Sequence, residues 1–476
     1  MAGQQPTQVK LQHSVKVPQF YKTAANIAKR ASEEHHSLKD LVFNANKHLN
    51  IQGLYALIIK TFHHEDTLER LIQKSKILKD RKADPWLIKI LITELLFGKK
   101  SLSGDSKPVQ AVLSHHDMFL AELKESEKAG TLKLDSYKER DSRPRYVRVN
   151  TLSLKVRAAM KMFSNEDWKQ VCYDRKSEDY SSFLNRVTSL ARDEFIQDLH
   201  IKELFIFPNK TEFYRHPLYI GGSIILQDKA SCLASWLLKP SPGSITLDMC
   251  AAPGMKTTHL ACLMKNKGTL YAVDSVRGRY ETLCKQVEKH GATCVKTLCM
   301  DAFQLEAKHC PGVEYILVDP TCSGSGAVEQ PIVKNREKFN ASRLQSLTRL
   351  QSKLLRHALT RFPDVKRIVY STCSLNIEEN EMVVEDVLAS VNTDASDPIF
   401  EVVDNKLKCK WIHHGSEDFE WGPRCIYTKP DIDLTNGFFI AVIDRVRSDE
   451  KNISRNEDEK EEQKHKKRKQ LKESKI

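Results

Sequence analysis

The sequence predicts an α/β fold whose second half forms a doubly wound parallel sheet, preceded by a helical segment and a small α+β unit. From residue 221 onward, short apolar runs alternate with longer amphipathic runs, which is typical of a parallel sheet covered on both faces. Apolar residues before residue 143 recur with helical period, and the residues between combine both patterns. We therefore expect domains at 1–143, 144–220 and 221–448, followed by a disordered charged tail at 449–476.

The helical segment contains one helix with clear start and stop signals. Asp84 can cap a helix, Pro85 suits its first turn, and Gly98 follows the last apolar residue. Two further amphipathic runs lie at 54–62 and 68–77. The charged stretch 122–143 is expected to be a flexible joint.

Two runs predict the strands of the small α+β unit. Residues 145–150 alternate β-forming with polar residues, and 203–207 form an apolar run that ends at Pro208. In the second half, five strands are expected at 244–248, 269–274, 295–298, 315–319 and 367–371. Helices fit between them at 256–264, 278–290 and 341–361. Two late strands at 424–428 and 438–446 are expected to close the sheet as a hairpin pair.

The chain has 476 residues and a formal net charge of +13. Residues 1–220 hold 37 Lys and Arg against 27 Asp and Glu, whereas residues 221–448 hold 28 against 27. The surplus therefore lies in the first half, where an acidic partner would be contacted. No apolar run is long enough to span a bilayer and the N-terminus lacks the apolar core of a secretory signal, so we expect neither a membrane protein nor a secreted one.

Twelve cysteines are spread along the chain without a Cys-x-x-Cys pair or the spacing of a zinc site. We therefore expect reduced thiols, a cytosolic or nuclear setting and no bound metal. The tail carries a basic run at 464–469, which fits a nuclear localisation signal, an RNA-binding arm or a solubilising segment.

A run of small residues follows the first predicted strand of the second half, in the segment LDMCAAPGMKT. Small side chains let the backbone approach a ligand closely at this edge of a doubly wound sheet, so the loop indicates a nucleotide-type ligand. Asp274 ends the next strand, where acidic residues contact ribose hydroxyls, and Asp301 follows the third strand, in reach of an adenine. Each Asp alone is explained as well by capping a turn, but together they favour a nucleoside site.

Two cysteines each follow the end of a predicted central strand. Cys322 lies in the segment DPTCSGSG, and Cys373 lies in YSTCS, with Glu378, Glu379 and Glu381 shortly after it. Because the carboxyl ends of parallel strands line one edge of a sheet, both thiols are expected to face one site. A disulfide between them is the alternative, which a reducing compartment disfavours.

These three segments resemble motifs I, IV and VI of the S-adenosylmethionine-dependent RNA cytosine-5 methyltransferases of the Nop/Sun family. PRYVRVNTL, HPLYIGGSIILQDKASCLAS and NGFFIAVIDRV are also similar to its eukaryotic branch, which methylates large-subunit (28S/25S) ribosomal RNA. The resemblance covers residues 144–446 and departs from the family pattern at Thr321, where Pro or Ser is usual. It implies a Rossmann-like methyltransferase sheet and S-adenosyl-L-methionine as the cofactor.

The resemblance also implies roles for individual residues. The cofactor-binding residues are expected to be Cys250, Ala251, Ala252, Pro253, Gly254, Met255, Lys256, Asp274, Arg279, Asp301 and Asp319. Among them, Lys256 would neutralise charge or position the base and the methionine end, and Asp319 would hydrogen-bond either the cytosine edge or the cofactor. Arg279 would brace the cofactor site, with an exposed helix position as the alternative.

The chemistry of cytosine explains the need for a cysteine nucleophile. Carbon 5 is too weak a nucleophile to attack a methyl sulfonium directly, and a thiolate that adds to carbon 6 makes it reactive. The resemblance assigns this thiolate to Cys373 and assistance in product release to Cys322. Because an ordinary thiol has a pKa near ~8.5, Cys373 needs activation by its surroundings.

The target base must be unpaired or flipped out to reach such a site. Arg145, Arg148 and the helical segment are expected to hold the RNA, with a solvent-facing strand position as the alternative for Arg148. The resemblance implies large-subunit ribosomal RNA and pre-ribosomal particles as partners, a monomer, and a location in the nucleus and nucleolus. Two other hypotheses remain open: a DNA cytosine-5 methyltransferase with Cys322 as nucleophile, and a catalytically silent ribosome-assembly scaffold that retains a cofactor pocket.

Overall fold

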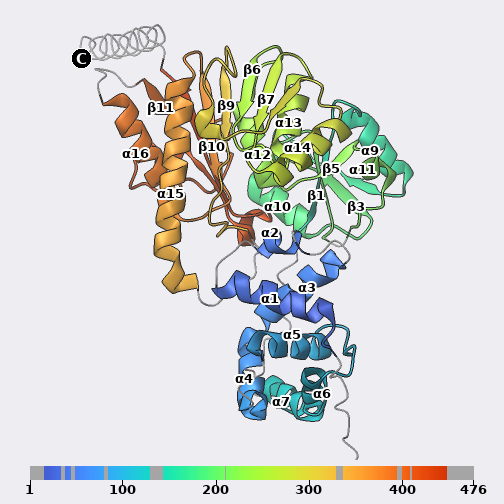
Figure 1. Ribbon diagram of the computed structural model, residues 1–476. Coiled ribbons are helices and arrows are strands. Elements are labelled where there is room, and N and C mark those ends of the chain that lie inside the picture. Colours follow the sequence, from blue (N-terminus) through green and yellow to red (C-terminus); the bar gives the residue numbers. More distant parts are fainter. Residues whose placement is uncertain are drawn as a thin grey trace, which may run out of the picture. The chain divides into compact units, whose positions relative to one another are not determined.

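The computed structural model describes residues 16–33, 38–43, 45, 49–79, 84–128, 143–209, 211–327, 336–393, 399–407 and 410–446. The chain divides into two compact units, residues 1–140 with 331–340 and residues 141–330 with 341–476 (Figure 1). The expected tail at 449–476 lies outside the described residues. No helix in the described ranges is both long and apolar enough to cross a membrane.

The first unit is helical in its described part. Its elements are α1 (Gln19–Glu33), α2 (Leu38–Phe43), α3 (Ile51–His63), α4 (Glu65–Ser75), η1 (Ile77–Lys79), α5 (Pro85–Leu96), α6 (Lys107–Leu113) and α7 (His116–Lys128). As predicted, Asp84 caps α5 by accepting a hydrogen bond from the backbone N–H of Trp86 (3.0 Å), and α5 ends just before Gly98. Since α5 packs against α1, α3, α4 and α6, it is apolar on nearly every side.

The flexible joint predicted at 122–143 is wrong for residues 122–128, which continue α7. The reason is tertiary packing, because Phe119 earlier in this helix is fully buried in the core of the unit and Glu122 forms an ion pair with Lys74 of α4. Residues 129–142 lie outside the described ranges.

The second unit contains two sheets, and the smaller has the strand order β2-β3-β4-β1-β5. Its elements are β1 (Arg145–Val149), α9 (Val156–Asn165), β2 (Lys169–Val171), α10 (Tyr180–Thr188), β3 (Glu194–Gln197), β4 (Leu204–Phe207), α11 (Pro217–Ile220) and β5 (Ile224–Leu226). The two strands predicted from the sequence are neighbours, because β1 pairs antiparallel with β4. β1 also pairs with β5, so this sheet extends beyond the domain boundary expected at residue 220.

The larger sheet has the order β11-β13-β10-β9-β6-β7-β8, with β12 added beside β13. Its strands are β6 (Ile245–Asp248), β7 (Thr269–Val273), β8 (Val295–Leu298), β9 (Tyr315–Val318), β10 (Arg367–Thr372), β11 (Phe400–Val402), β12 (Ile426–Thr428) and β13 (Phe438–Arg445). Its helices are α12 (Lys229–Leu238), α13 (Met255–Met264), α14 (Arg277–Lys289), η2 (Ala302–Gln304), α15 (Arg336–Arg361), η3 (Ile377–Glu379), α16 (Glu381–Asn392), η4 (Gly422–Arg424) and α17 (Pro430–Asp433).

The predicted α/β class with a doubly wound sheet is confirmed. Strands β6 to β10 run parallel, and the late strands β12 and β13 form the expected antiparallel pair. The short strand β11 and the helices α12 and α16 were not predicted. β11 has only three residues and pairs with β13, so its existence depends on a neighbour far away in the sequence.

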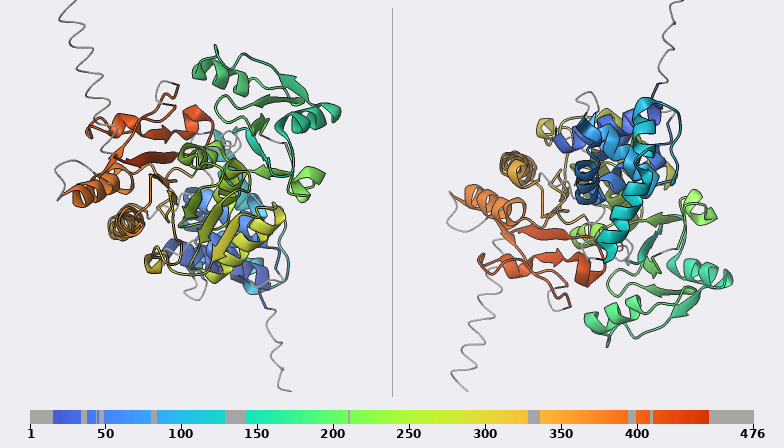
Figure 2. Two further views of the ribbon diagram at one scale, coloured as in Figure 1. Left: turned by 90° about the horizontal axis from the view of Figure 1, so that it is seen from above. Right: turned by 90° about the horizontal axis from the view of Figure 1, so that it is seen from below.

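Alternating side chains divide the larger sheet into two buried faces. Leu317, Val369 and Ile440 belong to one apolar core with α12 and α13, whereas Ile316, Ile368 and Phe439 belong to the opposite core with α15 and α16. Figure 2 shows the smaller sheet beside the larger one, on the side away from α15 and α16. Because side chains alternate between the two faces, each face of the sheet is apolar and is covered by helices.

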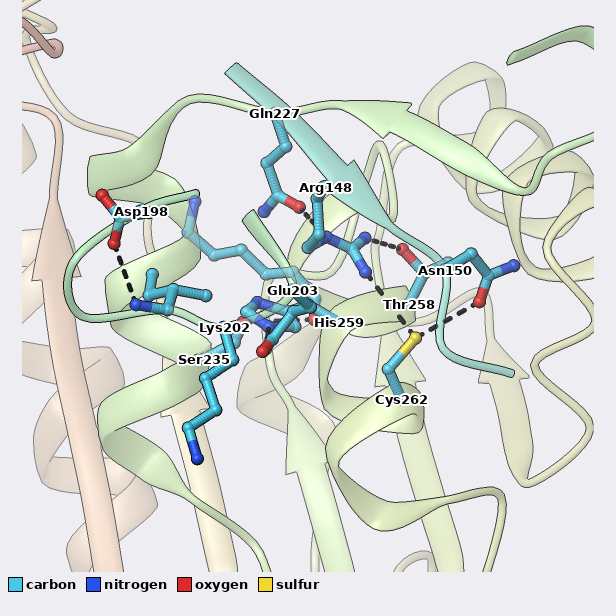
Figure 3. A network of polar contacts seen from close by, with 12 residues as sticks. Arg148, Asn150, Asp198, Lys202, Glu203, Gln227, Ser235, Thr258, His259 and Cys262 are labelled. Carbon is cyan, nitrogen blue, oxygen red and sulfur yellow. Dashed lines mark hydrogen bonds and ion pairs between the residues drawn. The ribbon is translucent and has the colours of Figure 1, made fainter. Parts of the chain in front are cut away.

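A buried arginine connects the smaller sheet to helix α13. Arg148 lies on β1 with no exposed surface, and its Nε donates a hydrogen bond to Oε1 of Gln227 (2.6 Å). Its Nη2 donates to Oγ1 of Thr258 on α13 (3.0 Å; Figure 3). The same nitrogen donates to the backbone oxygen of Met255, the first residue of α13 (3.3 Å). The expectation that Arg148 holds RNA, and the alternative that it faces solvent, are both wrong, because its guanidinium is buried and donates its hydrogen bonds to acceptors inside the protein.

Further polar contacts surround this arginine. Asn150 donates hydrogen bonds to the backbone oxygens of Gly222 and His290 (2.9 Å each) and accepts one from the thiol of Cys262 on α13 (3.3 Å). Glu203 lies 2.8 Å from Nε2 of the fully buried His259, also on α13. The amino-terminal part of the larger sheet is therefore docked on the smaller sheet through matched polar groups as well as apolar contacts.

A buried ion pair makes a second connection between the sheets. Lys229 at the start of α12 lies 2.7 Å from Asp198, and both side chains are almost fully buried. The ammonium group also lies 4.8 Å from the ring centre of Tyr180 and 5.3 Å from that of Trp411. Such a charge is tolerated in the interior because a carboxylate and aromatic faces replace its hydration.

We predict that Arg148→Met destabilises the second unit, whereas Arg145→Met does not. Removing the buried guanidinium leaves Oε1 of Gln227 and Oγ1 of Thr258 without this donor, which should lower the free energy of unfolding by about 3 kcal/mol. Arg145 lies on the same strand but is exposed, so the matched substitution should change it by less than about 0.5 kcal/mol. Hydrogen exchange of the α13 amides in increasing urea measures both values. Equal effects of the two substitutions would contradict the role of Arg148 in connecting the smaller sheet to α13.

Candidate active site

The candidate site lies where parallel strands of the larger sheet end. β6 pairs parallel with β7 and with β9, and β9 pairs parallel with β10, so the segments after these strands share one edge. The small-residue loop follows β6, Asp274 follows β7, Asp319 follows β9 and Cys373 follows β10. The topology therefore brings these four segments to one edge of the sheet, as the sequence predicted.

The loop between β6 and α13 is tightly packed. Ala251 and Ala252 are buried, Pro253 is exposed, and Gly254 has φ of 106°, a left-handed conformation that favours glycine. A Cβ atom on Gly254 would also lie 3.1 Å from Cδ1 of Leu283 on α14. Glycine at position 254 is therefore required both by the backbone conformation and by the close approach of α14.

Burial raises the pKa of two titratable groups near this loop, Asp248 and Cys250. Asp248, at the end of β6, accepts a hydrogen bond from Oγ1 of Thr257 (2.7 Å), while its buried Oδ1 has no partner among the described residues. Burial raises the pKa of this carboxyl to about 7. Burial also raises the pKa of the neighbouring Cys250 thiol well above its ordinary value, so this third cysteine stays protonated.

Arg279 connects the loop to the end of β7. Its guanidinium donates a hydrogen bond to the backbone oxygen of Ala252 (2.9 Å) and lies 3.4 Å from the carboxylate of Asp274. Asp274 is 6% exposed and accepts a hydrogen bond from the backbone N–H of Val276 (3.0 Å). Arg279 itself is partly exposed. The exposed helix position that was the alternative from the sequence and a contact to the loop therefore both apply to it.

Asp301 stands apart from these contacts. It accepts a hydrogen bond from the backbone N–H of Phe303 (3.0 Å) and so caps η2, as the capping alternative anticipated. Its side chain is exposed, and among the described residues no hydrogen bond or ion pair joins it to Asp274 or to the cysteines. A contact between Asp301 and a ligand stays a prediction.

Lys256 and Asp319 form an ion pair beside the cysteines. Nζ of Lys256 lies 2.8 Å from the Asp319 carboxylate, which also accepts a hydrogen bond from Oγ of Ser371 (2.7 Å). Burial by itself would lower the pKa of Lys256, but the charge and hydrogen bond of Asp319 outweigh burial, and the pKa lies above its ordinary value. Lys256 is therefore a permanent positive charge at this position.

Cys322 and Cys373 face each other with 3.0 Å between their sulfur atoms, and both are free thiols rather than a disulfide. The hydrogen bond with Cys322 lowers the pKa of Cys373 below its ordinary value, with help from the charge of Lys256 and against burial and the charge of Asp319. The same hydrogen bond, together with burial, raises the pKa of Cys322. The pair is therefore polarised, with Cys373 as the more acidic thiol.

A buried carboxylate beneath the two cysteines was noted in the sequence but received no role there. Glu379 is fully buried and accepts hydrogen bonds from Oγ of Ser323 and Oγ of Ser374, each at 2.5 Å. Each serine directly follows one of the cysteines. The sequence repeats a Cys-Ser pair at both sites, and Glu379 follows the second pair. No local pattern, however, indicates that Ser323, Ser374 and Glu379 lie in contact.

Comparisons with known proteins agree with this architecture. A family model described as 16S rRNA methyltransferase RsmB/F matches residues 235–444. Two models of NOL1/NOP2/Sun domain family member 5 match as well, its ferredoxin-like domain at residues 143–227 and its N-terminal domain at residues 52–130. The solved structure of PH0851, 20% identical in sequence, covers 91% of this chain and 100% of its own with a TM-score of 0.59, which supports the Rossmann-like fold.

Relatives with curated names match over most of their length. The 28S rRNA (cytosine-C(5))-methyltransferase of Drosophila melanogaster is 41% identical over 92% of this chain and 99% of its own. The enzyme of the same name from Mus musculus is 35% identical, over 90% and 91%. The 25S rRNA (cytosine-C(5))-methyltransferase rcm1 of Schizosaccharomyces pombe is 31% identical, over 89% and 90%. The resemblance found in the sequence is thus confirmed, and the chain belongs to the NSUN5/Rcm1 branch of the Nop/Sun family of RNA (cytosine-C5)-methyltransferases.

Proposed function

We propose that the chain forms 5-methylcytosine in large-subunit ribosomal RNA with S-adenosylmethionine as methyl donor, through a covalent adduct between Cys373 and carbon 6 of cytosine. The observation that carries this proposal is the polarised pair of thiols, in which Cys322 raises the acidity of Cys373. The relatives that cover most of the chain are named for the same reaction on 28S or 25S rRNA, which supports the substrate class.

The residues at the strand ends fit the cofactor. Asp274 offers a carboxylate for ribose hydroxyls, and in the loop from Cys250 to Met255 the small side chains of Ala251, Ala252 and Gly254 would let a ligand approach the backbone closely. Arg279 would brace this set, and Asp301 would lie at its far end. When bound, S-adenosylmethionine supplies an electrophilic methyl group.

The proposed reaction uses the two cysteines in sequence. The Cys373 thiolate adds to carbon 6, forming a carbon–sulfur bond and moving an electron pair toward carbon 5, which then takes the methyl group. Carbon 5 would next lose its proton to water, and the electron pair of that carbon–hydrogen bond would restore the double bond between carbons 5 and 6 as the carbon–sulfur bond breaks and returns the Cys373 thiolate. Cys322 lies 3.0 Å from the departing sulfur and would assist this release, while Lys256 and Asp319 would hold the base.

The alternative with Cys322 as nucleophile, as in DNA cytosine-5 methyltransferases, has weaker support. The hydrogen bond to Cys373 and burial raise the pKa of Cys322, so it is the less acidic thiol of the pair. A thiol that stays protonated is a poor nucleophile. A catalytically silent scaffold is not favoured by any contact in the site, and it remains an outcome of the experiment below.

We further propose a division of labour along the chain. The helical segment 1–143 and the unit at 144–220 would hold the RNA, the domain at 221–448 would carry out the chemistry, and the tail at 449–476 would add basic charge. The distribution of charge supports this, because 221–448 is nearly neutral. The names of the relatives support ribosomal RNA as the partner. We also propose that the chain acts as a monomer on pre-ribosomal particles in the nucleus and nucleolus.

Substitution of each cysteine should separate the two steps. Cys373→Ala should abolish methylation of large-subunit RNA, because no thiolate adds to carbon 6. Cys322→Ala should accumulate a covalent RNA–protein adduct, because release fails after addition. Labelled S-adenosylmethionine and denaturing gels measure both outcomes. An adduct that survives Cys373→Ala would refute the assignment, and a wild-type chain without any activity would favour the silent scaffold.

The acidity of Cys373 should follow the groups around it. Cys322→Ala removes the stabilising donor and should move the pH midpoint of Cys373 alkylation upward by about one pH unit. Lys256→Met should also move it upward, whereas Asp319→Asn should move it downward, because a repelling charge is lost. Iodoacetamide labelling followed by peptide mass spectrometry measures these profiles. The exposed Cys172 is the internal control, and unchanged midpoints in all three variants would contradict the proposed activation.

A further inference from the structure

Glu379 is a buried carboxylate, and both of its oxygens accept more than one hydrogen bond. Its Oε1 accepts hydrogen bonds from the backbone N–H of Ser323 (2.8 Å) and from the side-chain amide of Gln351 (3.0 Å). Its Oε2 accepts from the hydroxyls of Ser323 and Ser374 and from the side-chain amide of Asn376 (3.1 Å). Among the described residues it forms no ion pair, so hydrogen-bond donors alone replace its hydration.

These donors come from three separate parts of the chain. Ser323 belongs to the segment after β9 that carries Cys322, and Ser374 belongs to the segment after β10 that carries Cys373. Gln351 lies on α15 and is fully buried, and its amide also donates a hydrogen bond to the backbone oxygen of Thr321 (3.1 Å). One carboxylate thus connects both cysteine segments to each other and to the helix beneath them.

The two segments depend on this connection to different degrees. Cys373 directly follows β10, whose last residue Thr372 is paired with Phe439 of β13, so the sheet itself holds the nucleophile. Cys322 lies several residues beyond the end of β9 and has no such pairing among the described strands. Loss of Glu379 should therefore displace Cys322 more than Cys373.

We propose that Glu379 is a positioning residue that sets the distance between the two sulfur atoms and thereby controls product release more than methyl transfer. This inference rests on the proposed function, because release by Cys322 is part of that mechanism. Glu379 itself touches neither sulfur through a hydrogen bond and acts through Ser323 and Ser374.

The test compares Glu379→Gln and Glu379→Ala with Glu378→Ala in the full-length chain. Glu378 is the neighbouring residue, has the same side chain and is exposed, which makes it a matched control. The first measurement is the rate at which diamide closes a Cys322–Cys373 disulfide, followed by peptide mass spectrometry. This rate reports the distance between the sulfur atoms and requires no catalytic activity.

We expect the Glu379 variants to close this disulfide about tenfold more slowly than wild type, as expected for the loss of a hydrogen bond to a charged group. In single-turnover assays they should form the RNA adduct at a rate near that of wild type but release methylated RNA slowly, so that the adduct accumulates. Glu378→Ala should behave as wild type in both assays.

Three outcomes would decide against the proposal or separate it from the proposed function. Folded Glu379 variants with unchanged disulfide closure and unchanged adduct levels would overturn it, as would an equal loss of methyl transfer and release at unchanged disulfide closure. If the Glu379 variants fail to fold, Ser323→Ala removes one connection while keeping the carboxylate and should show the same two effects in milder form. If wild type makes no methylated RNA, the proposed function fails, while disulfide closure still tests the positioning role.

Discussion

The burial of the Arg148 guanidinium is the interaction on which the arrangement of the second unit depends. A guanidinium cannot lose its charge in a protein, so its donors must all find acceptors when water is removed. Here the acceptors come from the end of β5 and from the first turns of α13, which begins where the small-residue loop ends. The position of that loop is therefore determined by the neighbouring sheet as well as by its own strand and helix.

Opposing electrostatic effects determine the pKa of the Cys373 thiol, the proposed nucleophile. Burial and the Asp319 carboxylate disfavour a thiolate at Cys373, whereas the Cys322 thiol and the Lys256 ammonium favour it. Lys256 and Asp319 also form an ion pair, so their opposite charges cancel and together add no net charge to the site. The hydrogen bond between the two thiols is the largest of these effects, and it makes Cys373 the more acidic of the pair.

The formal charge of the chain overstates how much positive charge is available to RNA. Arg148 and Lys229 have almost no exposed surface, and Lys229 is matched by Asp198 within the interior. The residues that can contact phosphates are the exposed ones, such as Arg145. Strand periodicity would have placed Arg145 and Arg148 on opposite faces, and the face of Arg148 is covered by α13.

The sequence alone determined the α/β class, the parallel strands, the cap of α5, the small-residue loop and the placement of both cysteines at strand ends. These features are encoded by local periodicity and by residue types at the ends of single elements. The tertiary structure alone decided that Arg148 is buried, that β5 joins the smaller sheet, that residues 122–128 are helical and that Glu379 gathers both cysteine segments. Each of these depends on groups far apart in the chain, as with Arg148 and Thr258, 110 residues apart, and local pattern carries no information about which distant surface covers a side chain.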